Sequence, residues 1–533
     1  MERPATQADD RTRVGLALGL CVACVAVSLG LRWLYLAHPW RIDACEPQAF
    51  VAAEGLVGIM GRHILRGARP VFFYGQYYLG AFEAYLVAAV FGLLGESMTT
   101  LRLVPTAFAL AWIPLAGLIA ARVFGRAAGY LAAALVALPS PFAFQWGFTA
   151  WGGHSNVVMI LAAVYLLLLV LERVDRVRLA ALGFITGFSL WVNQLAVAYV
   201  PVYAYVLARW VRPTRKQVRL LLLAGVVGLG PLIYGNVVHP LATARNLAYR
   251  VGSSWRLSSR LVKQAPDEET RFYRSVPLFQ VLGAQPQRDG KWSLGGTAAA
   301  LMLLLGGLAG AWETYRRRRD APVVFRGAMV VLACIGMSVV VGISGFFGQP
   351  VGRYNLPLYP LLCALLAGWL VGRPRLALPT VALMAVIHAA QIAAAPPSEG
   401  RTPAKEVVAA LLQRGLDHGY GADNMYDIVF ESDERIVIEP VEWTRMGSYR
   451  SAVANASQVF YLYRDDQTGK VSYQVFMAYL AKAGIESSRF ELGEYHVLYD
   501  FQPAGKLSSE ALAAIREEIR SRKRGPRPRQ PES

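Results

Sequence analysis

The sequence lacks the motifs of most nucleotide-dependent and metal-dependent enzymes. It contains no Walker motif, no dinucleotide-binding glycine fingerprint, no HExxH and no paired CxxC, which disfavours energy-coupled pumps and zinc enzymes. Its five cysteines are scattered, and only Cys45 lies outside the apolar runs, so they predict neither a disulfide framework nor a set of metal ligands. Dense clusters of carboxylates are missing too, and we expect no metal and no other cofactor.

Charged residues are scarce relative to apolar ones. Only 17% of the 533 residues are charged, while 55% are hydrophobic, and the mean hydropathy is +0.35. These values predict an α-helical polytopic membrane protein. The net charge of +18 could indicate nucleic-acid binding, but many of the cations lie in short loops between apolar runs, as the positive-inside rule expects. We therefore expect membrane lipids as partners and no nucleic acid.

Twelve apolar runs are candidates for membrane spans. They lie near residues 14–37, 79–95, 99–121, 127–145, 155–171, 178–194, 196–210, 218–238, 295–312, 321–345, 355–371 and 375–395. The basic loops between them should face the cytoplasm, and parity then excludes 79–95 as a span. That run is short and contains Glu83, so we expect a helix on the outer membrane surface. About eleven spans remain, with residues 1–13 in the cytoplasm.

This topology divides the chain into a membrane domain, an outer domain and a tail. The membrane domain covers 14–395, and its outer loops are 38–98, 146–156, 239–293 and 346–355. A linker, AAPPSEGRTP at 394–403, precedes a small extracytoplasmic α/β domain over 396–505. Residues 506–533 are basic and are expected to be disordered. Within the outer domain we predict helices over 404–414 and 473–483 and strands over 435–439, 458–463 and 495–501.

The first outer loop concentrates polar side chains in an otherwise apolar protein. Residues 51–66 predict an amphipathic helix with Val57, Met60 and Ile64 facing lipid. Its polar face would hold an acid and several cations, which is consistent either with a site at the membrane surface or with a solvated charged face that has no chemistry. The candidate groups in this loop are Asp43, Glu46, Glu54, Arg62, His63, Arg66, Tyr74 and Gln76.

Two other outer turns carry candidate binding residues. Arg353 and Tyr354 lie in the turn before an apolar run; the planar guanidinium could bind a lipid phosphate, or it could extend to the interface beside belt aromatics. The turn from Trp146 to Asn156 is rich in aromatic residues and glycine and contains His154. Such a turn could stack on a sugar ring or form part of an aromatic belt.

Several segments of the sequence resemble a known superfamily. Residues 54–67 and 69–86 look like the first outer loop of bacterial membrane glycosyltransferases of the glycosyltransferase-C superfamily, of the family 39 type. That group includes relatives of protein O-mannosyltransferases and of the aminoarabinose transferase acting on lipid A. Weaker similarities follow in the same order along the chain, at Gly152–Gly153, at Arg353-Tyr354 with the prolines after it, and at 426–440.

The resemblance implies inverting transfer of a sugar from a polyprenyl-phosphate donor to a lipid, glycan or protein acceptor, outside a bacterial inner membrane. In the family an Asp-Glu pair opens the first-loop helix and supplies the base; this chain has Ala53-Glu54. The base would then be Glu54, or Asp43 or Glu46 folding back. A non-catalytic lipid-binding or transport protein of the same architecture is the alternative. The implied substrate-binding residues are Arg62, His63, Arg66, Tyr74, Gln76, Glu83, His154, Arg353 and Tyr354.

Overall fold

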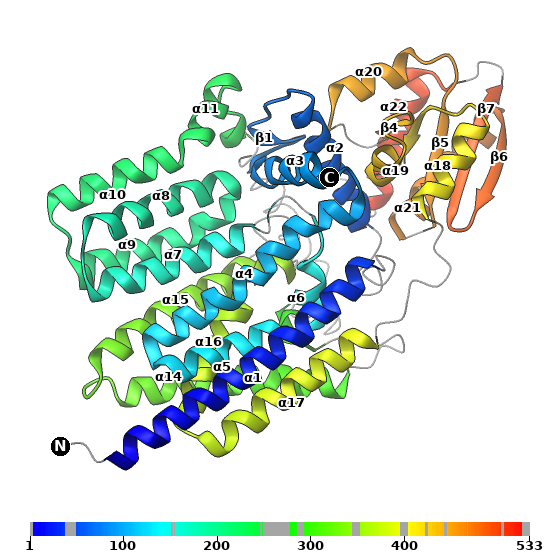
Figure 1. Cartoon of the computed structure of the whole chain (residues 1–533). Coiled ribbons are helices and arrows are strands. Elements are labelled where there is room, and N and C mark those ends of the chain that lie inside the picture. The colour runs from blue at the N-terminus through cyan, green and yellow to red at the C-terminus, as the bar shows by residue number, and fades with distance from the viewer. Residues whose placement is uncertain are drawn as a thin grey trace, which may run out of the picture.

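A bundle of apolar helices carries an α/β domain at one end. The computed structural model describes residues 4–37, 49–150, 153, 155–245, 248, 278–284, 293–343, 352–394, 403–421, 425–441, 445–465, 467–502 and 506–524. In Figure 1 the N-terminus lies at the lower left of the bundle and the α/β domain lies at the upper right. The predicted architecture, an α-helical membrane protein with a C-terminal α/β domain, is confirmed.

Several helices are long and apolar enough to cross a membrane. Six pass that test in the described part of the chain, and a seventh is added if α10 (Arg215–Gly228) and α11 (Gly230–Val238), bent by 51°, form one span. The number of spans, about eleven, stays a prediction. The six helices are α1 (Pro4–Ala37), α4 (Met98–Phe124), α7 (Ser155–Glu172), α14 (Leu294–Arg316), α15 (Pro322–Ile343) and α17 (Pro374–Ala393).

Shorter helices fill the space between and beside these spans. The predicted helix near 79–95 is present as α3 (Phe82–Leu94), and its 13 residues are too few to cross a bilayer. The other short elements are α5 (Arg126–Ala137), α6 (Pro141–Trp146), α8 (Arg176–Val192), η2 (Gln194–Tyr199), α9 (Val200–Val206), η3 (Leu207–Val211), η4 (Gly352–Asn355) and α16 (Leu358–Val371).

Several helices begin where a polar side chain satisfies the first backbone amides. Ser97 and Thr100 form a capping box at the start of α4, and Thr214 and Gln217 form one at the start of α10. Asp175 caps α8 by accepting from the amide of Arg178. These caps fix the helix ends because the first four amides of a helix have no partner within it.

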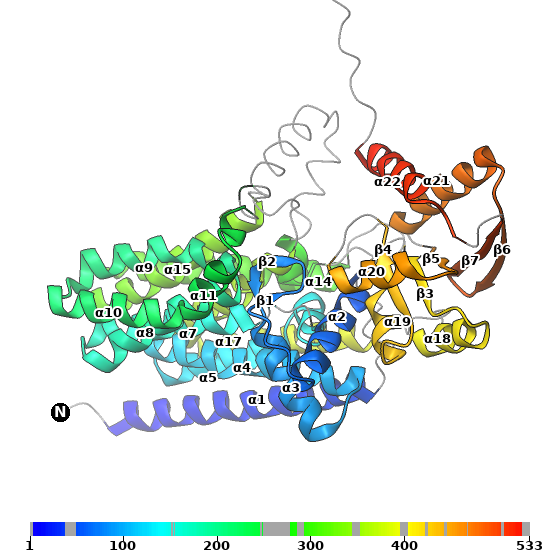
Figure 2. The ribbon, with the colours of Figure 1, turned by 90° about the horizontal axis from the view of Figure 1, so that it is seen from above.

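The helix of the first outer loop, α2 (Ala49–Leu65), is covered by protein. We predicted that Val57, Met60 and Ile64 would face lipid, and this is wrong, because Val57 and Met60 are fully buried and Ile64 is only 9% exposed. A Cβ on Gly55 would lie 2.2 Å from the carbonyl of Tyr426, and one on Gly58 would lie 2.7 Å from the Phe430 ring. The missing side chains let the C-terminal domain pack directly on α2. Figure 2 shows α2 beside that domain. The hairpin of β1 (Phe72–Phe73) and β2 (Gln76–Gly80) follows, and α3 packs alongside α2.

The C-terminal domain is built on a five-stranded mixed sheet of order β4-β3-β5-β7-β6. The pairs β3–β4 and β3–β5 are parallel, and the pairs β5–β7 and β6–β7 are antiparallel. The strands are β3 (His418–Gly421), β4 (Val437–Pro440), β5 (Phe460–Arg464), β6 (Glu486–Leu492) and β7 (Tyr495–Gln502); the helices are α18 (Ala404–Gln413), α19 (Tyr426–Glu431), α20 (Gly447–Asn455), α21 (Gln467–Ala483) and α22 (Ser509–Arg524).

The tail is partly structured. Residues 506–533 were expected to be disordered, which is wrong for the part that forms α22. Its buried side chains Ala511, Leu512, Ile515 and Ile519 recur at helical spacing and join the hydrophobic core beneath α21. This pattern lies before the proline-rich stretch, which begins at Gly525.

Candidate active site

Glu54, the first candidate for the base, is fully engaged by other groups. Its side chain is only 2% exposed. Arg102 of α4 donates to it from Nη2 to Oε2 at 2.7 Å and from Nε to both carboxylate oxygens at 3.3 Å. The amide of Ala150 donates to Oε1 at 2.9 Å. Both oxygens of Glu54 therefore already accept from buried donors, and the carboxylate joins α2 to α4 and to the second outer loop.

Glu83, one of the predicted substrate-binding residues, plays a similar part at the other end of that loop. It is buried in the first turn of α3, and it accepts from the amide of Ser155 at 2.7 Å and from the Ser155 hydroxyl at 2.9 Å. Glu54 and Glu83 therefore hold the two sides of the second outer loop, at Ala150 and Ser155. These two acids lie next to this loop, and in this arrangement they position it.

Arg62 anchors the C-terminal domain to the first outer loop. Its guanidinium is buried, with Nε 2.6 Å from Glu96 Oε2, Nη2 3.1 Å from Asp433 Oδ1 and Nη1 3.6 Å from Glu434 Oε1. Nη2 also donates to the Phe430 carbonyl at 3.3 Å, and the guanidinium carbon lies 4.8 Å from the centre of the Phe430 ring. Such a cation is stabilised in place by surrounding carboxylates.

His63, Arg66 and Tyr74 meet the same acid. His63 lies between the Tyr74 hydroxyl, 3.1 Å from Nδ1, and Glu434 Oε2, 2.9 Å from Nε2. The exposed Arg66 reaches Glu434 Oε1 at 3.4 Å. Burial alone would raise the pKa of Glu434, but hydrogen bonds from His63 and Tyr449 and the charges of His63 and Arg62 outweigh it and lower the pKa to about 2. Glu434 is thus the central acceptor of the interface.

Gln76 contributes a further link to the same interface. Its buried amide lies between Tyr78 and Arg445, and with its nitrogen toward Tyr78 its oxygen accepts from Arg445 Nη1 at 2.7 Å. Gly75, at φ +70°, leaves room for the Arg445 side chain against the turn between β1 and β2. Five of the first-loop candidates are therefore collected at one interface with the C-terminal domain: Arg62, His63, Arg66, Tyr74 and Gln76.

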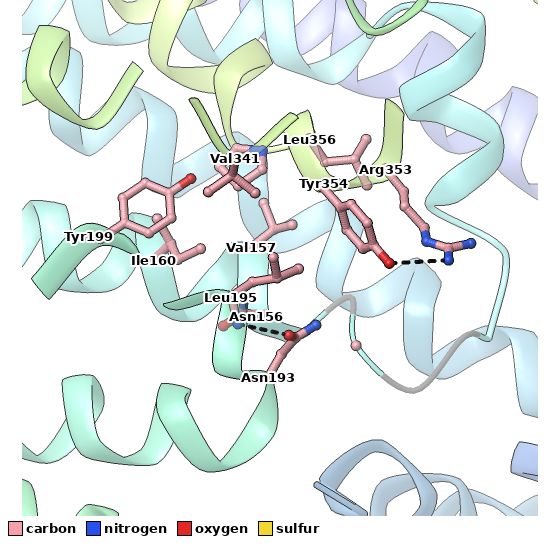
Figure 3. Close-up of a pocket in the computed structure, with 12 residues that line it drawn as sticks. Asn156, Val157, Ile160, Asn193, Leu195, Tyr199, Val341, Arg353, Tyr354 and Leu356 are labelled. Carbon is pink, nitrogen blue, oxygen red and sulfur yellow. Dashed lines mark hydrogen bonds between the residues drawn. The ribbon is translucent and has the colours of Figure 1, made fainter. Parts of the chain in front are cut away.

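A second set of candidates lines a narrow cavity of about 40 Å³ in the membrane domain. Arg353 and Tyr354 of η4 lie on one side of it and Tyr199 on the other (Figure 3). The Arg353 guanidinium is 5.5 Å from the centre of the Trp146 ring and 5.1 Å from that of Tyr354, and Nη2 donates to the Tyr354 hydroxyl at 3.4 Å. The remaining lining is Gly153, Asn156, Val157, Ile160, Asn193, Leu195, Val341, Leu356 and Pro357.

Two carboxamides give this cavity further polar groups. Asn156 Oδ1 accepts from the Ser189 hydroxyl at 2.8 Å, and Asn193 Oδ1 accepts from the amide of Leu195 at 3.0 Å. The cavity is therefore lined by a guanidinium, two amides, two phenol rings and aliphatic side chains. None of the first-loop candidates that the structure describes lines it.

Three predicted residues lie outside the described part of the chain: Asp43, Glu46 and His154. Among the residues that the structure does describe, no group of three or more His, Cys, Asp and Glu side chains could hold a metal ion.

Sequence reasoning missed two buried arginines in the described part of the membrane domain. One is Arg102, the partner of Glu54. The other is Arg32 of α1, whose guanidinium lies 4.8 and 5.3 Å from the ring centres of Phe144 and Phe148. Both stand inside apolar runs, where an ionised side chain is costly and usually has a purpose. An arginine inside an apolar run was therefore the signal that could have identified both residues.

Comparison with known proteins identifies the fold. No family model matches the chain, and a search of curated proteins finds no match either. Among solved structures, ArnT from Cupriavidus metallidurans bound to undecaprenyl phosphate matches with a TM-score of 0.58 and 14% identity, over 92% of this chain and 100% of that chain. The apo state of the same protein gives a TM-score of 0.55 and 14% identity, over 91% of this chain and 98% of that chain.

An archaeal enzyme matches as well. The Archaeoglobus fulgidus oligosaccharyltransferase, tethered with an acceptor peptide that contains the NVT sequon, gives a TM-score of 0.52 and 14% identity, over 88% of this chain and 71% of that chain. At such low identity the likeness concerns the fold. The chain therefore has the fold of glycosyltransferase-C proteins, as the resemblance in its first outer loop predicted.

Proposed function

We propose that the protein is a membrane glycosyltransferase that takes its sugar from a polyprenyl-phosphate donor and transfers it to a lipid, glycan or protein acceptor. The fold supports this, because nearly the whole chain superposes on a protein solved with undecaprenyl phosphate. We further propose a bacterial inner membrane, with the N-terminus in the cytoplasm and the C-terminal domain outside, as the distribution of basic loops favours.

The cavity beside Arg353 is the proposed site for the donor phosphate, and it is the observation on which the proposal depends most. Arg353 presents a planar, permanently charged fork beside a narrow cavity, stacked on Trp146 and Tyr354. Such a fork pairs well with phosphate oxygens. The small volume suits a phosphate group better than a sugar ring, so the sugar would lie toward the second outer loop, near Gly153.

The proposed reaction is an inverting displacement. The acceptor hydroxyl oxygen attacks the anomeric carbon, the bond from that carbon to the phosphate oxygen breaks, and polyprenyl phosphate leaves with the electron pair. A carboxylate takes the proton of the hydroxyl. Arg353 stabilises the charge that develops on the leaving phosphate.

The base is proposed to be a carboxylate of the first outer loop. Protonation of Glu54 would break its ion pair with the buried Arg102, and an unpaired buried cation is costly. This favours Asp43 or Glu46 as the base and assigns Glu54 to holding Ala150 in place.

The alternative is a non-catalytic lipid-binding or transport protein of the same architecture. Ala53, at the position of the family Asp, and the full engagement of Glu54 both favour it. The two functions differ in whether the sugar–phosphate bond is broken. Binding of the donor through Arg353 is common to both, so binding alone cannot separate them.

The test follows release of free polyprenyl phosphate by mass spectrometry. Membranes with the wild-type protein receive a mixture of polyprenyl-phosphate sugars, and the variants Arg353→Gln, Asp43→Asn and Glu46→Gln are treated in parallel. Loss of one oxyanion-stabilising donor should slow release by about 10²-fold. Arg414→Gln is the matched control, because Arg414 stacks on the Phe490 ring at 4.2 Å in the C-terminal domain. Donor binding without release by the wild type, with acceptors supplied, would favour the non-catalytic alternative.

A further inference from the structure

A second and larger cavity lies at the opposite end of the helix bundle. Its volume is about 390 Å³, and it is bounded by the last turns of α4, α14 and α16 and by the start of α15. These ends lie away from the C-terminal domain (Figure 1). In the proposed orientation this end faces the cytoplasm. Pockets of this size are typical of sites for small ligands.

Close backbone packing frames the cavity. A Cβ on Gly310 of α14 would lie 2.5 Å from the carbonyl oxygen of Leu365, and one on Gly368 of α16 would lie 2.6 Å from the Phe124 ring. The glycines let α14, α16 and α4 meet tightly. Beyond this contact the helices end, and the space between them is walled by apolar side chains such as Phe124, Val324 and Trp369.

The polar side of the cavity is built around one acid held by two arginines. Glu313 lines the cavity; its Oε1 lies 2.7 Å from Arg317 Nη2 and its Oε2 lies 2.8 Å from Arg373 Nη1. Arg373 in turn lies 4.6 Å from the centre of the Trp369 ring. This group carries a net positive charge, and the adjoining turn at 316–319 is a run of four arginines.

We propose that this cavity binds the head group of an anionic glycerophospholipid, such as phosphatidylglycerol. Arg317, which lines the cavity, suits the phosphate, and Arg373 adds positive charge through its pair with Glu313. Glu313 and Thr314 suit the hydroxyls of the glycerol head, and the apolar wall suits the start of the acyl chains. Basic pockets between spans on the cytoplasmic side favour anionic lipids. The site goes beyond the proposed transfer reaction, because the two sites lie at opposite ends of the bundle.

The test measures lipid retained by the full-length protein in detergent, by native mass spectrometry, together with the shift in Tm on adding lipid. The probes are phosphatidylglycerol, phosphatidylethanolamine with the same acyl chains, and soluble glycerol-3-phosphate. We expect phosphatidylglycerol to be retained preferentially. Arg317→Gln should lower its affinity about fivefold, the contribution of one basic residue near an anionic lipid. Glu313→Gln should raise the affinity, because it removes a negative charge and keeps an acceptor.

Two further variants separate this site from general surface charge. Ala321→Leu fills the cavity without changing charge and should lower retention of phosphatidylglycerol. Arg178→Gln is the matched control, since Arg178 pairs with Asp175 at 2.9 Å at a helix end but does not line the cavity, and it should have no effect. Equal loss in Arg178→Gln and Arg317→Gln, equal retention of the two lipids, or an equal Tm shift with glycerol-3-phosphate would each overturn the proposal. The readouts need no sugar transfer, so they are independent of the proposed function.

Discussion

The two groups of candidate cations lie in very different surroundings. Arg62 is buried at the interface of α2 with the C-terminal domain, where three carboxylates surround it. Arg353 lines a cavity and stacks on the rings of Trp146 and Tyr354. The same side chain is thus an anchor in one region and a candidate ligand-binding group in the other. The difference comes from the segments that fold over each arginine.

The interface and the cavity should therefore respond differently to substitution. At the interface, removing a charge leaves buried partners without a counter-charge and should mainly affect stability. At the cavity, removing a charge should mainly affect binding or turnover. If a substitution at the interface mainly changed turnover, or one at the cavity mainly changed stability, the division between the two regions would be wrong.

The largest expected effect is on the buried pair of Glu54 and Arg102. Glu54→Gln leaves the Arg102 guanidinium buried without a counter-charge, so we expect the free energy of unfolding to fall by about 3 to 5 kcal/mol. The double variant Glu54→Gln with Arg102→Gln removes both charges and should regain most of this loss. Thermal unfolding in detergent measures both. Full wild-type stability of the single variant would contradict the structural role.

The same double variant tests the chemistry. If it folds and still releases polyprenyl phosphate, Glu54 is not the base. If it folds and releases none while Asp43→Asn and Glu46→Gln stay active, Glu54 is the base after all. The double variant thus separates the effect of Glu54 on stability from its effect on turnover.

The next effect concerns Arg62. Arg62→Ala should destabilise the protein by about 3 kcal/mol, because it leaves Glu96 and Glu434 close together without the buried cation. Hydrogen exchange should rise first in α19, which packs on α2. The control is Arg66→Ala: Arg66 reaches the same Glu434 but is 61% exposed, so the change should stay within about 0.5 kcal/mol. Equal effects of the two variants would contradict an anchoring role for Arg62.

Much of the fold was predictable because its signals are local. The spans appear as long apolar runs, and β5 and β7 lie where the sequence predicted strands. β3 was missed, because its four residues, HGYG, include two glycines and give no strand signal. Strand β6 was also missed. Its side chains are exposed or only partly buried, so its sequence shows no clear alternation of apolar and polar residues. Helix α22 was missed because its basic composition concealed a short apolar stripe.

The candidate site was less predictable, because its partners are distant in sequence. Arg102 lies 48 positions after Glu54, and Asp433 lies 371 positions after Arg62. No periodicity or spacing connects such pairs, and they are decided by which surfaces pack together. The sequence showed which segments are polar, but it could not separate a cation that anchors a domain from one that lines a cavity.

A smaller effect should come from changing the shape of the Arg353 cation while keeping its charge. Arg353→Lys replaces a planar fork by a point charge, so we expect release of polyprenyl phosphate to slow by about tenfold, less than for Arg353→Gln. Stability should not change, as unfolding in detergent would verify. Unchanged release by Arg353→Lys together with loss in Arg353→Gln would mean that only the charge matters and that no fork geometry is used.

The last effect is the response of the interface to acid, which depends on Glu434. Its pKa is about 2 in the folded protein, against an ordinary value of 4.5. A lowered folded pKa stabilises the protein fully above about pH 4.5, and this stabilisation is lost as the pH falls toward 2. We expect the Tm of the wild type to fall over this window, and Glu434→Gln to be less stable at pH 7 with a shallower fall. Asp433→Asn is the control, since that side chain is 72% exposed and should leave the slope almost unchanged. If Glu434→Gln and the wild type show the same slope, the acid response comes from other carboxylates, and the hydrogen bonds from His63 and Tyr449 do not hold the interface together.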